Sequence, residues 1–205
     1  MRSIRLFALS TAAAFTAATF APASEAQAAP QDFVIDGSHS HIVFLVDHLG
    51  YSKNVGRFQE FSGEFTMDED APENSSVSVT IQSTSVFTDH AERDEHLRSP
   101  DFLNAQEFPT ITFESTGVEV TGENTAEVTG DFTMMGQTHP VMLDVTFNRV
   151  APHPLPQYDG VLTAGFSARG SLQRSQWGMD TFVPAIGDDI DLIIEIEGAD
   201  AAAAE

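Results

Sequence analysis

The sequence predicts an all-β protein, an antiparallel barrel of about eight strands with one short helix around residues 89–99. Apolar and polar residues alternate along most of the chain, which is typical of strands with one buried and one wet face. The alternating segments at 55–67, 125–135 and 160–172 exceed the usual strand length of about five to six residues. Long, tilted strands favour a closed barrel over a sandwich.

Residues 1–28 are predicted to be a secretory signal peptide. Two arginines precede an apolar or small-residue run at 6–21, and an Ala-x-Ala pattern ends at Ala28. Serines and threonines interrupt the run and Pro22 follows it, so it is a poor permanent membrane anchor. We therefore expect export to the periplasm with cleavage after Ala28, or alternatively after Ala23.

We expect one barrel domain over residues 29–198 and a flexible acidic tail at 199–205. Glycine-containing turns at Gly117, 122–124 and Gly136 would join antiparallel strands. Since side chains alternate across a strand, one parity of each segment should face the interior. The expected inward residues are Phe61, Gly63, Phe65 and Met67; Val77, Val79 and Ile81; Ile111 and Phe113; Ala126, Val128, Gly130, Phe132 and Met134; Val141, Leu143, Val145 and Phe147; Leu162, Ala164, Phe166 and Ala168; and Ile190, Leu192, Ile194 and Ile196.

The helix at 89–99 is the segment that breaks the alternation. Leu97 is its only large apolar residue, so most of the helix should be exposed. Asp89 is the expected N-cap, with Glu92 in the first turn. Pro100 should end the helix because a proline cannot continue it.

The charge balance limits the possible partners. The chain has nine basic and 31 acidic residues; without Arg2, Arg5 and Glu25 of the predicted signal peptide, seven and 30 remain, a net charge of −23. Nucleic acid needs clustered Lys and Arg, and anionic lipid surfaces should repel this chain, so neither is an expected partner. We interpret the acidity as a solubility adaptation rather than a site for a cationic partner. There is no cysteine, so the core alone must hold the exported protein.

The histidines do not form a convincing metal site. On one strand, His39 and His41 would point to the same side, but His48 has the opposite parity and lies more than roughly 20 Å away. A third ligand would have to come from elsewhere in the chain. We therefore predict no bound metal and no cofactor.

Catalytic groups are equally weakly indicated. Asp94 and Glu95 are adjacent, so on a helix they point about 100° apart and cannot form a facing carboxylate pair. Ser167 lies in GFSARG, where the last glycine comes one position too late for a nucleophile elbow. The charged helix residues have a simpler interpretation as a solvated surface. We predict that the protein is not an enzyme.

Several expected inward positions carry very small residues. Small residues facing inward would leave room for a ligand in a small barrel. Alternatively, they only permit bends or close packing. Both interpretations stay open for Gly63, Ala126, Gly130, Ala164, Ala168 and Gly170.

Four segments in register give a more specific indication. They are IDGSHSHIVFLVDHLGYSKNVGRFQEFSGEF (35–65), RDEHLRSPDFLNAQEFPTITFES (93–115), VTGDFTMMGQTHPVMLDVTFN (128–148) and GFSARGSLQRSQWGMDTF (165–182). The chain resembles the YceI-like family of bacterial exported proteins over nearly all of its mature length. The resemblance implies a lipocalin-like barrel whose apolar interior binds polyisoprenoids or other long-chain amphiphiles, and no catalytic activity.

Together these observations predict a periplasmic carrier of a long-chain isoprenoid or similar lipid, without stable membrane insertion and with a possible homodimer. The residues expected to contact the lipid are Phe44, Val46, Phe61, Phe65, Ile81, Leu97, Phe102, Phe113, Phe132, Phe147, Ala164, Phe166, Ala168, Trp177 and Ile194. The possible head-group contacts are His48, Arg93, Asp94, His96 and Arg174. The alternatives are an enzyme acting on a lipid-linked substrate through Asp94, His96 or His48, and a ligand-free, stress-related structural protein.

Overall fold

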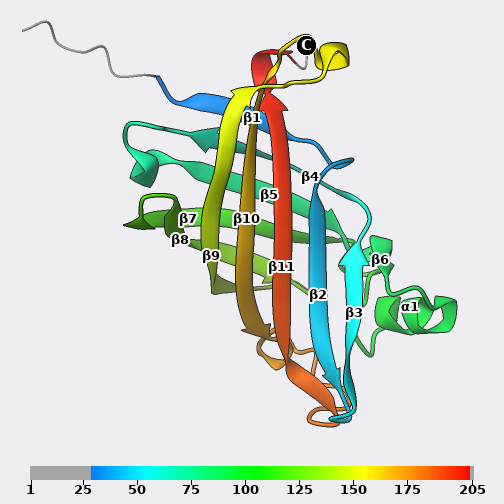
Figure 1. Ribbon diagram of the computed structural model, residues 1–205. Coiled ribbons are helices and arrows are strands. Elements are labelled where there is room, and N and C mark those ends of the chain that lie inside the picture. Colours follow the sequence, from blue (N-terminus) through cyan, green and yellow to red (C-terminus); the bar gives the residue numbers. More distant parts are fainter. Residues whose placement is uncertain (1–28, 204–205) are drawn as a thin grey trace, which may run out of the picture.

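The computed structural model describes residues 29–203, most of them in antiparallel strands (Figure 1). The predicted signal peptide lies outside these residues. The strands and the helix are β1 (Gln31–Ile35), β2 (His41–His48), β3 (Ser52–Phe58), β4 (Phe61–Met67), β5 (Ser76–Gln82), β6 (Val86–Phe87), α1 (Ala91–Arg98), β7 (Thr110–Gly122), β8 (Thr125–Met134), β9 (Gln137–Pro152), β10 (Leu162–Gln173) and β11 (Ile186–Asp200). Within 29–203, no helix combines the length and apolar character needed to cross a membrane.

Eight of the strands close into a barrel. The order β1-β4-β5-β7-β8-β9-β10-β11 returns to β1 because β11 also pairs with β1. The chain then leaves β1 through a turn and continues as β2, which pairs with the remaining length of β11. Strands β3 and β6 extend the sheet outward from β2. The prediction of an antiparallel barrel of about eight strands with one short helix is therefore confirmed.

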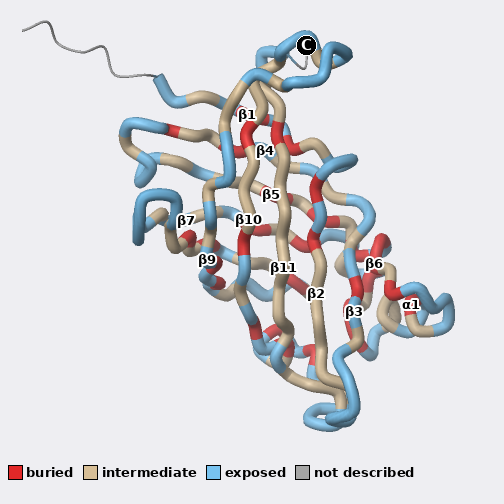
Figure 2. Tube along the Cα trace, viewed as in Figure 1, coloured by how far each residue is buried: buried red, intermediate tan, exposed pale blue. Residues whose placement is uncertain are grey.

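The barrel forms because the alternating apolar residues meet inside it. Phe33 of β1 stacks on Phe65 of β4 with 4.9 Å between ring centroids. Phe166 of β10 meets Phe65 edge-on at 5.4 Å and Phe147 of β9 at 5.5 Å. Such geometries are favourable between aromatic rings beyond the area they bury. Figure 2 shows buried positions recurring along the barrel strands, whereas the loops at the ends are largely exposed.

Two predicted boundaries differ from the structure. The expected strand 55–67 is interrupted at Gln59 and Glu60, because β3 pairs with β2 whereas β4 pairs with β1. Gln59 N donates to Ser85 O (3.1 Å), which fixes this turn against the segment before β6. The expected tail also begins too early: β11 continues to Asp200, whose carboxylate accepts a hydrogen bond from Gln31 Nε2 (2.9 Å).

The start of the helix differs as well. α1 begins at Ala91, and its N-cap is His90, whose Nδ1 accepts a hydrogen bond from Arg93 N (3.4 Å). The predicted cap, Asp89, has a left-handed backbone with φ of 63° and lies one residue too early. The helix ends at Arg98 before Pro100, as the sequence predicts.

Candidate functional site

The inner face of β11 and parts of the inner faces of β2 and β10 carry apolar side chains that neighbouring residues cover only in part. Strand β11 lies between β10 and β2, so any exposure of its side chains cannot come from an open sheet edge. Its inward residues Ile190, Leu192 and Ile194 are nevertheless only partly buried, at the margin of the core. By contrast, Phe33 and Ile111 elsewhere in the barrel are 1% and 2% exposed. The inward residues of β11 are therefore less completely covered than the best-buried core residues, and Phe61 and Phe132 on other strands share this partial burial.

The predicted lipid contacts fall into two groups by burial, and this division does not follow the strands: Ala164 and Ala168 of β10 are fully buried, whereas Phe132 of β8 is not. Eight of them are partly buried: Phe44, Val46, Phe61, Leu97, Phe132, Phe147, Phe166 and Ile194. Seven are fully buried among other side chains: Phe65, Ile81, Phe102, Phe113, Ala164, Ala168 and Trp177. The first group has surface to offer a ligand, whereas the second group forms the packed core.

For the small inward residues, close packing explains the glycines. A Cβ at Gly130 would collide with the Phe113 ring, and one at Gly170 would meet Leu143 Cδ2 at 2.7 Å. Ala164 is 0% exposed. Ala168 is also buried, so neighbouring side chains cover both alanines in this structure, which favours close packing; their contact with a lipid stays a prediction.

Two shallow hollows on the described surface lie away from this lining. One, of about 120 Å³, lies over β4, β5 and β7 and is lined by polar residues such as Glu64 and Glu114. The other, of about 50 Å³, lies beside Gln31 and Met67. Both volumes are well below the roughly 300–1,000 Å³ typical of small-molecule pockets. The partly buried apolar residues of β11, β10 and β2 border neither hollow, and their character suits an apolar ligand better than the polar lining of the larger hollow does.

Arg174 cannot contact a head group. Its side chain is 2% exposed, and its guanidinium donates to four backbone carbonyls, those of Gly187, Met179, Thr181 and Ile186, at 2.7–3.0 Å. Burial lowers the pKa of Arg174, but an arginine keeps its charge in proteins. The predicted ligand contact is therefore a structural residue that fixes the loop before β11.

Asp94 and Arg93 are also occupied. Asp94 is buried, and its carboxylate accepts hydrogen bonds from the backbone N–H (2.8 Å) and the hydroxyl of Thr88. Arg93 donates from Nε to the same hydroxyl and from Nη2 to Thr88 O (2.6 Å). Both side chains thus fasten α1 to the end of β6, which argues against Asp94 as a head-group contact or a catalytic acid.

His96 and His48 keep some exposure. His96 Nε2 lies 2.9 Å from Asp101 Oδ2, and its ring meets Phe102 edge-on at 5.0 Å and Phe182 at 6.2 Å. His48 ends β2 opposite Ile186, partly buried. The structure brings neither of them into a group with a second predicted head-group residue that is free to bind.

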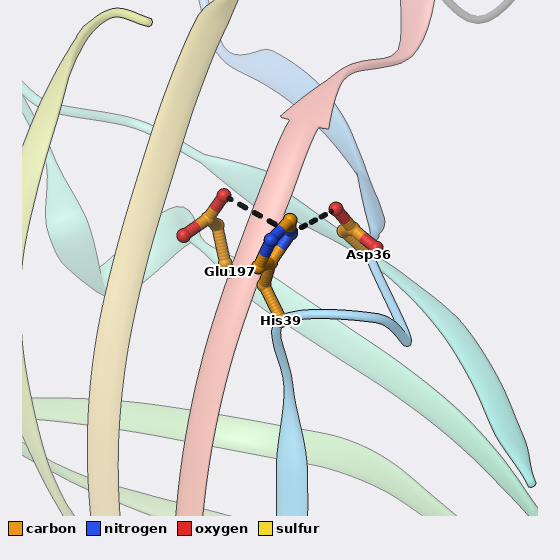
Figure 3. A group of neighbouring side chains, drawn as sticks. All are labelled: Asp36, His39 and Glu197. Atoms are coloured by element: carbon orange, nitrogen blue, oxygen red, sulfur yellow. Dashed lines mark hydrogen bonds and ion pairs between the residues drawn. The ribbon is translucent and has the colours of Figure 1, made fainter. Parts of the chain in front are cut away.

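A polar cluster that the sequence did not indicate lies where β1 passes into β2. His39 is in the turn rather than on a strand, so it does not share a strand face with His41. Its Nδ1 lies 2.8 Å from Asp36 Oδ2 and 3.9 Å from Glu197 Oε1 on β11 (Figure 3). Glu197 was missed because its place beside His39 depends on strand pairing between distant segments; the Asp-Gly-Ser-His turn was the available signal.

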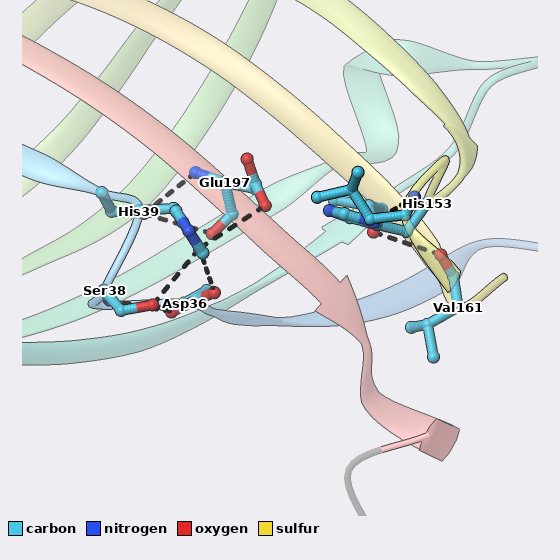
Figure 4. A network of polar contacts seen from close by, with 9 residues as sticks. Asp36, Ser38, His39, His153, Val161 and Glu197 are labelled. Atoms are coloured by element: carbon cyan, nitrogen blue, oxygen red, sulfur yellow. Dashed lines mark hydrogen bonds and ion pairs between the residues drawn. The ribbon is translucent and has the colours of Figure 1, made fainter. Parts of the chain in front are cut away.

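Hydrogen bonds account for this arrangement. The Ser38 hydroxyl donates to Asp36 Oδ1 (2.6 Å), as Figure 4 shows. The same view includes the loop between β9 and β10, where His153 N donates to Val161 O (2.8 Å). Partial burial alone would raise the pKa of Asp36, but the hydrogen bonds from Ser38 and His39 lower it to about 2. The hydrogen bond and charge of Asp36 raise the pKa of His39.

The cluster does not by itself identify a metal site. The candidate ligand atoms of Asp36, His39 and Glu197 lie within 4.8 Å of one another. Exposed carboxylates often come this close, and here the imidazole already holds Asp36 through Nδ1. The absence of a bound metal stays a prediction.

Comparison with known proteins agrees with this architecture. A family model described as the YceI-like domain matches residues 33–198. Protein YceI of Escherichia coli O17:K52:H18 is 41% identical over 177 residues, covering 85% of this chain and 90% of the relative. The crystal structure of the Campylobacter jejuni YCEI protein is similar, with a TM-score of 0.68 and 31% identity over 75% of this chain and 89% of the other.

A more distant structure shares the fold. A polyisoprenoid binding domain from Saccharophagus degradans has a TM-score of 0.58 at 11% identity and covers 82% of this chain and 98% of its own. At that identity the likeness concerns the fold alone. The family match and the E. coli relative are much stronger, and they show that this chain belongs to the YceI-like domain family.

Proposed function

We propose that this protein is an exported carrier that holds a long-chain isoprenoid or a similar amphiphilic lipid inside its barrel. The observation that carries the proposal is the incompletely covered apolar lining of β2, β10 and β11, which includes Phe44, Phe166 and Ile194. Membership of the YceI-like domain family supports a binding protein. The name of the Saccharophagus degradans domain supplies the lipid class to test first.

The shape of the barrel suits a long apolar chain. Strands β9 and β11 have 16 and 15 residues, which corresponds to roughly 50 Å of extended backbone. Removing apolar ligand surface from water contributes about 25 cal/mol per Å² before entropic costs. Since such burial is non-directional and one methylene changes little, we expect modest selectivity for chain length.

A carrier is better supported than an enzyme. The candidate acid Asp94 is held by Thr88, and Arg174 is enclosed by carbonyls. His96 and His48 remain, but His96 is already paired with the exposed carboxylate of Asp101 (2.9 Å), and the described residues give His48 no acid or base partner for chemistry on a substrate. A filled structural barrel would not need the partly exposed lining beside β11.

The periplasm is the proposed location. It depends on residues 1–28, whose composition is that of a cleaved signal peptide. The intact mass of the exported protein should equal that of a chain that begins at Ala29. A protein that still starts at Met1 would contradict this location without affecting the proposed ligand.

Solvent extraction tests the ligand. The protein is purified from the periplasm without detergent, extracted with chloroform and methanol, and the extract is analysed by mass spectrometry. We expect one class of long-chain, apolar amphiphile at near-stoichiometric amounts. An empty extract, together with no uptake of isoprenoid from detergent micelles, would reject the proposal; chemical turnover of the lipid would favour the enzyme.

A further inference from the structure

One end of the barrel carries a group of exposed apolar side chains. Leu49, Tyr51, Phe182 and Val183 are 36–89% exposed and make up four of the nine large apolar residues exposed in the described chain. They come from two loops, the β2–β3 turn and the segment before β11. Figure 1 shows these loops projecting together beyond the rest of the barrel. We call these four residues the apolar tip.

The two loops form one connected unit. Leu49 N donates to Ala185 O (2.9 Å), and Ile186 N donates to Phe182 O (2.9 Å). His48 and Ile186 are strand partners immediately behind the tip. The two loops that carry the four side chains are therefore joined to each other at one end of the barrel.

The tip is held in place from inside. Arg174 donates to Thr181 O and Ile186 O, the carbonyls on either side of the Phe182–Val183 segment. Phe182 also lies 6.3 Å from the buried Phe102 ring. A buried charge, whose desolvation is costly, therefore fixes the backbone that presents two exposed apolar side chains.

The backbone at the tip is unusual in the same way. Leu49 and Phe182 have φ values of 59° and 64°. A bulky residue with a left-handed backbone is uncommon, because the conformation favours glycine or asparagine. The backbone of these turns does not require large side chains at Leu49 and Phe182. Any advantage of leucine and phenylalanine there must therefore come from their side chains.

From this we propose that the apolar tip is the surface on which the protein rests on an uncharged lipid bilayer while it exchanges its ligand. The proposal rests on the function proposed above, since a carrier of a membrane lipid must collect it from a bilayer. Tyrosine and phenylalanine are typical of the membrane–water interface, where an apolar body meets a polar boundary. Loops that project beyond the rest of the barrel suit shallow insertion better than they suit a flat protein interface.

The charges around the tip select the kind of surface. Asp47, Asp180 and Asp189 flank it in the sequence, and the only lysine, Lys53, is paired with Asp191. Anionic lipid would repel this rim. A second copy of the chain would bring the same carboxylates together. Zwitterionic phosphatidylcholine offers apolar contact without either repulsion.

Vesicle flotation tests the proposal. Delipidated wild-type protein is compared with the double variant Leu49→Asn/Phe182→Asn; asparagine tolerates the left-handed backbone, so the turns should persist. Met142→Asn is the matched control, since Met142 is 53% exposed elsewhere on the barrel, on β9. We expect the wild type and the control to float with phosphatidylcholine vesicles, and the double variant to lose roughly tenfold or more of its partitioning.

Three outcomes would overturn the proposal. In the first, the wild type does not float, and in the second, the double variant floats like the wild type. In the third, sedimentation velocity shows that the wild type is a dimer and the double variant a monomer. Vesicles with about 30% phosphatidylglycerol should bind less protein at low salt; tighter binding there would contradict the choice of an uncharged surface. Thermal unfolding checks that the double variant is folded.

The proposed ligand is judged separately. Uptake of isoprenoid from detergent micelles does not require a bilayer, so the double variant should load normally by that route. If the wild type floats but yields and takes up no lipid, the carrier function fails while the membrane contact stands. If it loads from micelles but never floats, the membrane contact fails alone.

Discussion

The ring of Phe113 on β7 lies over Gly130 on β8, in the space that a Cβ at residue 130 would occupy. Gly130→Ala should therefore lower the free energy of unfolding by about 1–3 kcal/mol, as overpacking does in a filled core. Gly117→Ala is the control, because nothing lies within 4 Å of a Cβ placed there. Urea unfolding of both variants measures the difference; equal stabilities would mean that the ring moves away freely.

Arg174 supports a second prediction. Arg174→Met keeps much of the side-chain volume but leaves four buried or partly buried carbonyls without their donor. We expect a loss of about 3 kcal/mol or more, since each unsatisfied group costs about 1–3 kcal/mol when buried. Arg149→Met removes an exposed arginine and should change the stability by less than about 0.5 kcal/mol. Similar small effects in both variants would contradict a structural role for Arg174.

The His39–Asp36 contact predicts a pH dependence. The pKa of His39 is raised above 6.5, so its contribution to stability is fully present below that value and is lost as the pH rises through the raised pKa. The pKa of Asp36 falls from 3.8 to about 2, so its contribution is present above 3.8 and is lost as the pH falls toward 2. Both contributions coexist between about pH 4 and 6.5.

His39→Gln removes the titrating group. The Tm difference between the wild type and His39→Gln should be largest near pH 5.5 and should shrink by about pH 9, when the imidazole is neutral. Other titrating groups cancel in this difference. A Tm difference that stays constant across this range would show that charge contributes nothing to the contact.

The sequence predicted the barrel because the signal for it is local. In each strand the period-two pattern depends only on neighbouring residues, and the inward positions of Phe65, Ile81 and Val128 follow from it. The segment 55–67 was misread as one strand since alternation continues on both sides of the turn at Gln59 and Glu60. Only the change of partner from β2 to β1 separates the two strands.

The polar sites were less predictable for a physical reason. Glu197 reaches His39 because β1 and β11 pair, and Ser40 binds the same residue across 157 positions of sequence. The groups that bind Arg174 are backbone carbonyls. Because every residue has a carbonyl, no pattern of side chains indicates which of them will bind an arginine. Its charge suggested a ligand contact, whereas the fold of the loop decided its role.

The account depends most on the lining beside β11, and two adjacent residues allow a direct test. Ile194 faces the interior, between Ala168 of β10 and Ile42 of β2, whereas Ile193 on the same strand points outward beside Arg169 and Val43. Ile194→Trp should occupy ligand space, and Ile193→Trp should not. Thermal unfolding of the delipidated proteins first confirms that both variants fold.

The decisive measurement is the amount of lipid extracted from each variant, determined by mass spectrometry and expressed per mole of protein. We predict that Ile194→Trp is folded and carries at most about one tenth of the wild-type lipid, a loss that corresponds to roughly 1.4 kcal/mol or more of binding free energy at subsaturating ligand. Ile193→Trp should carry the wild-type amount. Equal lipid content in folded Ile194→Trp and Ile193→Trp would contradict a ligand site inside the barrel.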